Sequence, residues 1–259
     1  MNRREFLCGA LAAAALGSGR MTWAGPAAGK RWYRGNLHTH TLVSDGQAFP
    51  VEAALLYKRF GYDFLMLSDH NAVHDRELWI TEKNHHRRSF FETHARRFAA
   101  EYPAYRPQTR TEADGTTAWR YGAFEETAAA VNEPGRFLLM SGCEYHNEVR
   151  TGEQLHCLGI NVRQGHRAIF PNSLEESMAE MLKEHLRKND GRKSIFVVNH
   201  PLYWLYDVAP TLLSEHDEIT HFEVANWDSR PEVRLPGGYD EDKLWDYALA
   251  RRCLRGGRG

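Results

Sequence analysis

Residues 63–71 read Asp-Phe-Leu-Met-Leu-Ser-Asp-His-Asn, a short apolar run that ends in polar side chains. An apolar run without alternation is typical of a strand that is covered on both faces. The preceding segment, residues 50–60, has helical spacing and is followed by Gly61, which predicts a helix and its end. A helix beside a doubly covered strand predicts an α/β fold.

The alternation of strands and helices continues along the chain. Further strands are predicted at residues 34–38, 136–141, 155–161, 195–199 and 221–225, and further helices at 82–102, 124–131, 174–187 and 240–251. This alternation favours a parallel sheet or barrel with helices outside it. Residues 73–135 are interpreted as an insertion between two strands, and the polar stretch 103–117 within them as a surface loop.

Side chains that can bind a metal follow or interrupt the predicted strands. They are His38, His40 and Asp45 after the first strand, Asp69 and His70 after the second, Glu144 after the third, His156 within the fourth and His200 after the fifth. On an extended segment, residues two apart point the same way, so His38 and His40 can reach one ion. A structural role would be favoured for any one of these histidines alone, but their recurrence at strand ends favours a metal site.

The chemistry of these side chains indicates a hydrolase. Neutral imidazoles and carboxylates suit Zn²⁺, Mn²⁺ or Fe²⁺. Two such ions about 3.5–4 Å apart clamp a phosphoryl group and generate hydroxide at neutral pH. Glu144 is the best candidate to bridge two ions, because it is an acid standing alone among histidines.

Five segments, in order LHTHTLVSDG, FLMLSDHN, GCEYH, LHCLG and VVNHP, resemble the PHP (polymerase and histidinol phosphatase) family of metal-dependent phosphoesterases. The resemblance spans roughly residues 34–250 apart from 73–135. It implies a distorted seven-stranded β/α (TIM-like) barrel with two to three divalent ions (Zn, Mn or Fe). The implied metal ligands are His38, His40, Asp45, His70, Glu144, His156 and His200. Asp69 either fixes the ligands from behind or caps a helix, and His146 and Asn226 are candidates for substrate contact or for a structural role.

The sequence departs from the family pattern near its C-terminus, where a final strand with Asp-x-His is expected. The predicted helix 240–251 is followed instead by Cys253-Leu254-Arg255-Gly256-Gly257-Arg258-Gly259, which is a poor strand. By the resemblance, only Glu144, His156 and His200 then keep a complete ligand set. We hypothesise a frameshift or premature stop in the gene, which makes an inactive, truncated metal-binding pseudoenzyme one alternative.

Residues 1–28 predict an export signal. Arg3 and Arg4 precede a short apolar run with small residues near Ala24, which is typical of a signal peptide. The run is shorter than the ~20 residues needed to span a bilayer. The arginine pair resembles the twin-arginine signal. We therefore expect a mature domain from about residue 29, exported by the twin-arginine machinery to the periplasm or medium, with no stable membrane anchor.

Composition limits the functional class. The chain has 33 Lys and Arg against 34 Asp and Glu, a net charge of −1, and 42% apolar residues. It therefore has ordinary globular composition without the positive field of nucleic-acid-binding proteins. The excess of Lys and Arg in residues 73–110 predicts a solvated helix face, with attraction of an anionic substrate as the alternative. Unpaired thiols are favoured for Cys143, Cys157 and Cys253, with a Cys143–Cys157 disulfide as the alternative.

Together these features predict an exported metal-dependent hydrolase that acts on a small-molecule phosphate ester. One alternative is hydrolysis of a carboxylic or carbamate ester at the same kind of site. Another is an amidohydrolase, which the sequence disfavours because such enzymes bridge their ions with a lysine where this chain offers Glu144.

Overall fold

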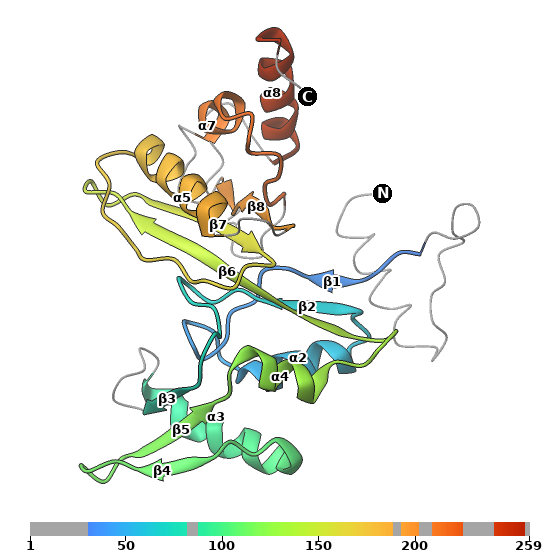
Figure 1. The fold of residues 1–259 in the computed structure, drawn as a ribbon, viewed down its shortest axis with the longest axis vertical. Coiled ribbons are helices and arrows are strands. Elements are labelled where there is room, and N and C mark those ends of the chain that lie inside the picture. The colour runs from blue at the N-terminus through green and yellow to red at the C-terminus, as the bar shows by residue number, and fades with distance from the viewer. Residues whose placement is uncertain (1–30, 82–87, 189–192, 202–208, 225–240, 257–259) are drawn as a thin grey trace, which may run out of the picture. The chain divides into compact units, whose positions relative to one another are not determined.

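A computed structural model describes residues 31–81, 88–188, 193–201, 209–224 and 241–256 (Figure 1). Residues from Arg34 onward form one compact unit. The expected export signal and Asn226 lie outside the described residues. Among the helices that are described, none is long and apolar enough to cross a membrane.

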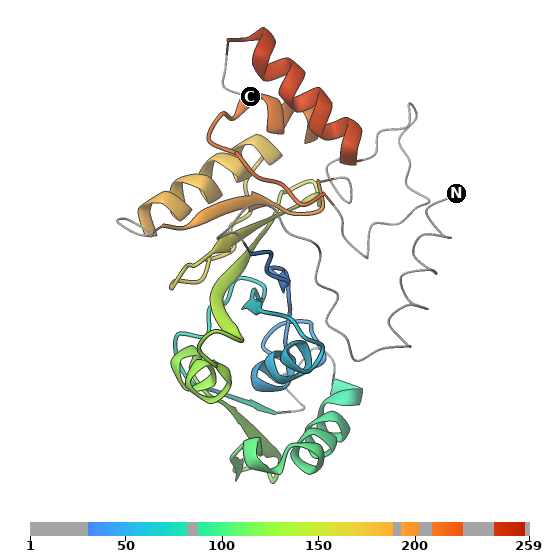
Figure 2. The same ribbon diagram turned by 90° about the vertical axis from the view of Figure 1, so that its right-hand side faces the viewer.

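The main sheet has five strands in the order β1-β2-β6-β7-β8 and is curled (Figures 1 and 2). Its strands are β1 (Gly35–Asn36), β2 (Phe64–Leu67), β6 (Leu138–Glu148), β7 (Gln154–Ile160) and β8 (Ile195–Val198). β1, β2 and β6 run parallel, whereas β7 is antiparallel to both β6 and β8. Each strand overlaps a range that the sequence predicts.

The expectation of a seven-stranded β/α barrel is wrong. The described strands form a half-barrel with two edges, β1 and β8, and a separate smaller sheet. The difference begins at β6, which was expected to end at Ser141 but continues to Glu148. With Gly152 in the turn at a φ of 96°, the chain then returns directly as β7. A hairpin makes neighbouring strands antiparallel, whereas each step of a parallel barrel needs a long crossover.

The chain after β8 also differs from the expected pattern. The strand predicted at residues 221–225 is reduced to one parallel bridge between Val198 and Phe222. Cys253 and Leu254, where the family pattern has a strand, continue a helix.

Helices cover the main sheet. They are α2 (Pro50–Arg59), α4 (Phe124–Val131), α5 (Leu174–Lys188), α7 (Ala209–Glu215) and α8 (Glu241–Leu254). Leu65 and Leu67 of β2 pack against α2 and α4, while Met66 packs on the opposite face with Leu158 and Ile160. The three β2 side chains are at most 1% exposed, and burial of each contributes about 1.5–3 kcal/mol. The prediction that both faces of this strand are covered is confirmed.

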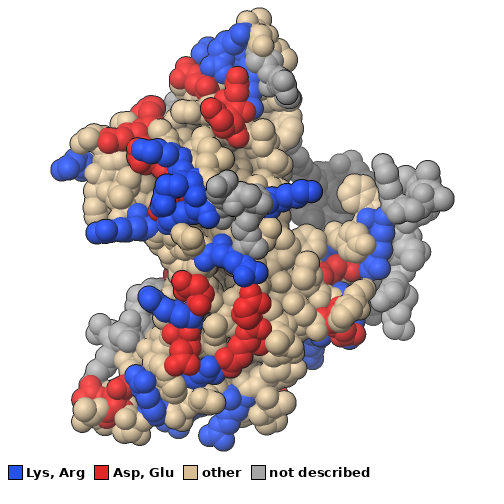
Figure 3. Space-filling view, in the orientation of Figure 1, with Lys and Arg blue, Asp and Glu red and all other residues tan. Residues whose placement is uncertain are grey.

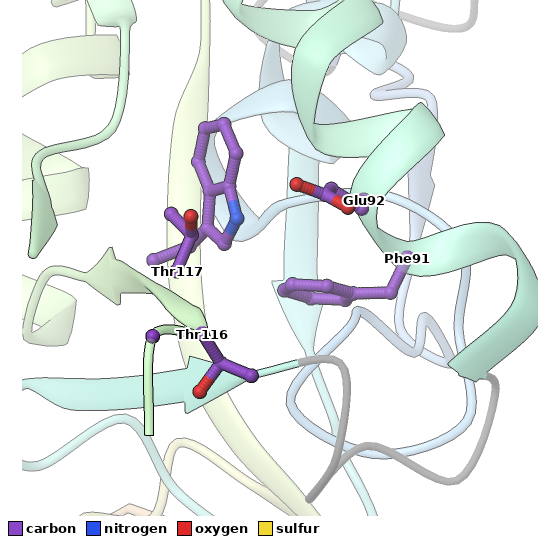
Figure 4. A pocket seen from close by; sticks show the side chains of 6 residues that line it. Phe91, Glu92, Thr116 and Thr117 are labelled. Atoms are coloured by element: carbon purple, nitrogen blue, oxygen red, sulfur yellow. The ribbon is translucent and has the colours of Figure 1, made fainter. Parts of the chain in front are cut away.

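The segment between β2 and β6 builds a second, three-stranded sheet in the order β3-β5-β4. Its elements are β3 (Leu78–Thr81), α3 (Arg88–Glu101), a 3₁₀ turn (Pro103–Tyr105), β4 (Thr109–Thr111) and β5 (Thr117–Tyr121). The surface loop predicted at 103–117 is therefore wrong, because β4 pairs with β5 within it. Leu42, which lies between β1 and α2, packs into the core of this sheet with Trp119 and with Phe91, which is labelled in Figure 4.

Charged side chains of both signs are interspersed on the face shown in Figure 3. In the segment 73–110, Arg96 pairs with Glu92 and Arg110 with Glu112. These exposed ion pairs agree with the interpretation of this basic stretch as a solvated surface.

Candidate metal centre

Glu144 lies at the centre of the predicted site, in the middle of β6 and 0% exposed. Its Oε1 is 3.1 Å from His38 Nε2, and its Oε2 is 2.8 Å from His40 Nε2. His38 and His40 follow β1, and their two Nε2 atoms are 3.1 Å apart. Both imidazoles of the His-x-His motif thus point the same way, but neither of the two groups with metal-ligand geometry described below contains both of them.

Three more imidazoles contact the same carboxylate from other strands. His70 follows β2 and places Nδ1 3.1 Å from Glu144 Oε2. His156 lies within β7 with Nδ1 3.3 Å from Oε1, and His200 follows β8 with Nε2 3.5 Å from Oε1. Five histidines from four separate segments of the chain thus surround one buried carboxylate.

These atoms form two groups with metal-ligand geometry. One group is His38, Glu144 and His200, and the other is His40, His70 and Glu144. Within each group the ligand atoms all lie within 4.8 Å of one another. We call them the first and the second group. Glu144 belongs to both, as expected of a bridging carboxylate.

Two of the residues implied as ligands lie beside these groups. Asp45 Oδ1 is 2.5 Å from His40 Nδ1, and Asp45 Oδ2 is 3.8 Å from His70 Nε2. His156 contacts Glu144 but belongs to neither group. The resemblance implies a different division, with Glu144, His156 and His200 as one complete set.

A buried atom without a hydrogen-bond partner indicates that the cluster fits a cation. His156 Nε2 is buried and has no hydrogen-bond partner. An unsatisfied buried polar atom is costly. A divalent ion accepts imidazole and carboxylate ligands together and would satisfy such atoms.

The electrostatics of the cluster also favour a cation. Burial lowers the pKa of His38, but hydrogen bonds to Glu144 and Glu223 outweigh it and raise that pKa to about 9. Burial likewise opposes the hydrogen bonds to Asp45 and Glu144 that raise the pKa of His40 to about 10. At neutral pH both rings are therefore protonated, and their positive charge balances the negative charge of the buried carboxylate. A metal ion would displace those protons, because ligating imidazoles must be neutral at the bonding nitrogen.

Asp69 holds the loop that carries His40. Its carboxylate is 0% exposed and accepts hydrogen bonds from the backbone N and Oγ1 of Thr41 and from the backbone N and Oγ of Ser44. His74 Nε2 lies 2.8 Å from Asp69 Oδ2. The helix-cap alternative is wrong, because residues 70–77 contain no helix. The expectation that Asp69 fixes the ligands from behind agrees with this geometry.

His146 lies beside the cluster, with ring centroids 5.1 Å from His70 and 4.3 Å from His156. The Asn71 side chain accepts a hydrogen bond from His146 N at 2.8 Å and donates to His146 O at 3.0 Å. Asn71 itself has a φ of 55°, a left-handed conformation that asparagine adopts more readily than most residues.

Two residues at the site were missed by the sequence analysis. Asn199 donates from Nδ2 to Glu144 Oε1 at 2.7 Å. Glu223 Oε1 is 3.1 Å from His38 Nδ1. The available signal for Glu223 was a single acid between the apolar Phe222 and Val224, the same interruption that marks His156 in its strand.

The cysteines near the site are free. Cys143 and Cys157 are both buried thiols, and Cys253 is exposed. Burial raises the pKa of Cys143 to about 12. The preference for unpaired thiols over a disulfide agrees with this arrangement.

Two comparisons with known proteins found no match for this chain. No family model matches the chain. No curated protein matches it either.

Proposed function

We propose that the chain is an exported metal-dependent hydrolase that acts on small-molecule phosphate esters. The observation that supports this most directly is the pair of ligand groups sharing Glu144. Two divalent ions held by these groups would supply Lewis acids for phosphoryl oxygens and would lower the pKa of a water molecule. The motif resemblance to PHP phosphoesterases supports the same reaction class.

The residues around the cluster hold the ligands in place. Glu144 is buried and accepts a hydrogen bond from Asn199, which fixes its orientation. Asp69 fixes the loop that carries His40. Such preorganisation is what catalysis by positioned charges requires. The side chain shared by the two groups is a carboxylate, which supports a phosphoesterase over an amidohydrolase with a bridging lysine.

The test combines metal content with turnover. The chain would be stripped of metal and reloaded with Zn²⁺, Mn²⁺ or Fe²⁺. Elemental mass spectrometry would count the bound ions. Turnover would be assayed with p-nitrophenyl phosphate, bis-p-nitrophenyl phosphate and p-nitrophenyl acetate. We expect two bound ions and turnover of a phosphate substrate. Turnover of the acetate alone would instead favour a carbon-ester hydrolase. One ion or none, without turnover, would contradict both.

A matched pair of variants controls for folding. Glu144→Gln removes the shared charge and should abolish binding of at least one ion. Glu148→Gln makes the same chemical change at the exposed end of the same strand and should leave metal content and turnover unchanged.

A further inference from the structure

Glu223 and His38 come from opposite edges of the curled sheet. β1 forms one edge, and His38 follows it. At the other edge, Val198 N donates to His221 O at 3.1 Å and Glu223 N donates to Val198 O at 2.9 Å. Residues 221–223 therefore lie alongside the end of β8. The contact between Glu223 and His38 joins two edges that no described strand connects.

The two oxygens of Glu223 hold two members of the first ligand group. Oε1 lies 3.1 Å from His38 Nδ1. Oε2 accepts a hydrogen bond from His200 N at 2.9 Å. The side chain of Glu223 is 16% exposed, so water competes only in part for these oxygens.

The backbone at His200 needs such a partner. His200 has a φ of 24°, in the left-handed region that side chains other than glycine rarely adopt. A conformation of this kind persists only when its surroundings hold it. The hydrogen bond from His200 N to Glu223 contributes to that restraint.

The contact with His38 also sets which nitrogen faces the ion. A neutral imidazole carries its proton on one nitrogen and an acceptor lone pair on the other. A carboxylate at Nδ1 keeps the proton there and leaves Nε2, which faces Glu144, free to bind a metal. His40 is arranged in the same way, with Asp45 at Nδ1 and Glu144 at Nε2. Each histidine of the motif thus has a carboxylate at Nδ1, which for His40 is Asp45 of the same loop and for His38 is the distant Glu223.

We propose that Glu223 is a positioning residue that orients His38 and His200 for the ion of the first group. It contacts two ligands of that group, whereas His40 and His70 of the second group have Asp45 beside them. Loss of Glu223 therefore weakens one ion selectively. This inference rests on the proposed function, because it requires that the first group binds a metal.

The test compares Glu223→Ala, Glu223→Gln and Glu223→Asp. Glutamine keeps one acceptor oxygen and so can serve His38 or His200 but not both. Aspartate keeps both oxygens and the charge on a shorter side chain. Loss of such a partner typically costs about 10- to 100-fold in metal affinity. We expect Glu223→Ala to weaken one of two ions by that factor, with Asp recovering more than Gln.

Affinity and stoichiometry would be measured by competition with a chromophoric chelator and by the visible spectrum of the Co²⁺ protein. Amide exchange of His200 in the metal-free protein gives a second readout, because Glu223→Ala removes the acceptor of that amide and should speed its exchange. Glu218→Gln, an exposed acid five residues away, is the matched control.

The outcomes separate this inference from the proposed function. A wild-type chain that binds no ion would overturn both. Two ions bound with equal affinity by the wild-type chain and by Glu223→Ala would overturn the role of Glu223 alone. One ion lost by Glu223→Ala, with the other ion and the control unchanged, would support it.

Discussion

At the scale of one residue, Asp69 shows how a loop is held in place beside the candidate metal centre. Burial raises its pKa, but the hydrogen bond to His74 and those to Ser44 and Thr41 outweigh burial, so the carboxylate stays ionised. A buried charge is stable only when its hydrogen bonds are complete. His74 is itself buried, at 4% exposed, and supplies one of these bonds.

We predict that His74→Leu destabilises the fold by about 1.5–3 kcal/mol, the usual contribution of a hydrogen bond to a charged group. It should also weaken metal binding, because Asp69 then holds Thr41 and Ser44 less firmly. Urea denaturation and chelator competition measure the two effects. His74→Gln keeps a donor and should recover part of both, and equal stability of the Leu variant and the wild type would refute the prediction.

His185, which is not one of the candidate ligands, should make the stability of the fold depend on pH. The side chain is 3% exposed and lies between Tyr145 Oη and Ser194 Oγ, each 3.1 Å from a ring nitrogen. Burial lowers the pKa of His185 from 6.5 to about 4. The unfolded chain therefore binds a proton at a pH where the folded chain does not, and stability falls as the pH drops from 6.5 towards 4.

Because of the lowered pKa of His185, its contribution to the free energy of unfolding is expected to be about 2 kcal/mol less favourable at pH 5 than at pH 7.5. Denaturation of the wild type and of His185→Gln across this range measures the effect. The variant should lose most of the acid destabilisation, while His221→Gln, at an exposed histidine, should keep it. The same change in stability from pH 7.5 to 5 in the wild type and in His185→Gln would show that His185 titrates normally.

Most of the candidate ligand side chains could be predicted from sequence because they interrupt or follow an apolar run. His38, His70 and His200 follow short strands, and their motifs are local. Glu223 also interrupts an apolar run, but its partner could not be predicted, because its contact with His38 joins residues 185 apart in sequence. The division of ligands into two groups also depends on how the strands are placed in space, which no local pattern specifies.

At the scale of elements, helix positions were predicted better than strand connections. α2 and α4 match their predicted ranges because amphipathic spacing and end signals are local. The β6–β7 hairpin was missed because Gly142 to Glu148 contains polar side chains that suggest a loop. In the fold those residues form a strand that is covered on both faces near its middle, with Cys143, Glu144 and Tyr145 all buried.

Arg252 joins two elements at the C-terminal end of the described chain. It lies on α8, is 7% exposed, and donates to the carbonyl oxygens of Leu213, His216 and Ile219. These acceptors lie in α7 and the turn that follows it. One guanidinium therefore satisfies several carbonyls at a helix end that would otherwise lack donors.

We predict that Arg252→Ala lowers the free energy of unfolding by about 2–4 kcal/mol, because it removes several charge-assisted hydrogen bonds and leaves buried carbonyls unpaired. Arg252→Lys should recover little, since an ammonium cannot match the planar fork. Thermal denaturation compares them with Arg251→Ala, a change at the exposed neighbour. If both alanine variants lose the same small amount, Arg252 does not hold α7.

At the scale of the whole molecule, the half-barrel is joined at its edges by side chains. His38 follows the β1 edge and His200 follows the β8 edge, and their rings stack with centroids 5.8 Å apart. Both belong to the first ligand group. An ion in that group would therefore link the two edges of the sheet, and metal binding and sheet closure should be coupled.

We predict that removing the metal lowers the melting temperature and loosens both edges together. At a free metal concentration 100 times Kd, a ligand that binds only the folded state adds about 2.7 kcal/mol, or roughly 5–10 °C for a domain of this size. Hydrogen exchange before and after chelation measures where protection is lost. Exchange should rise at residues 34–38 and 195–200, while β5, in the separate three-stranded sheet, serves as the internal control. A rise confined to one edge would contradict the coupling, because a single ion held by His38 and His200 must release both edges when it leaves.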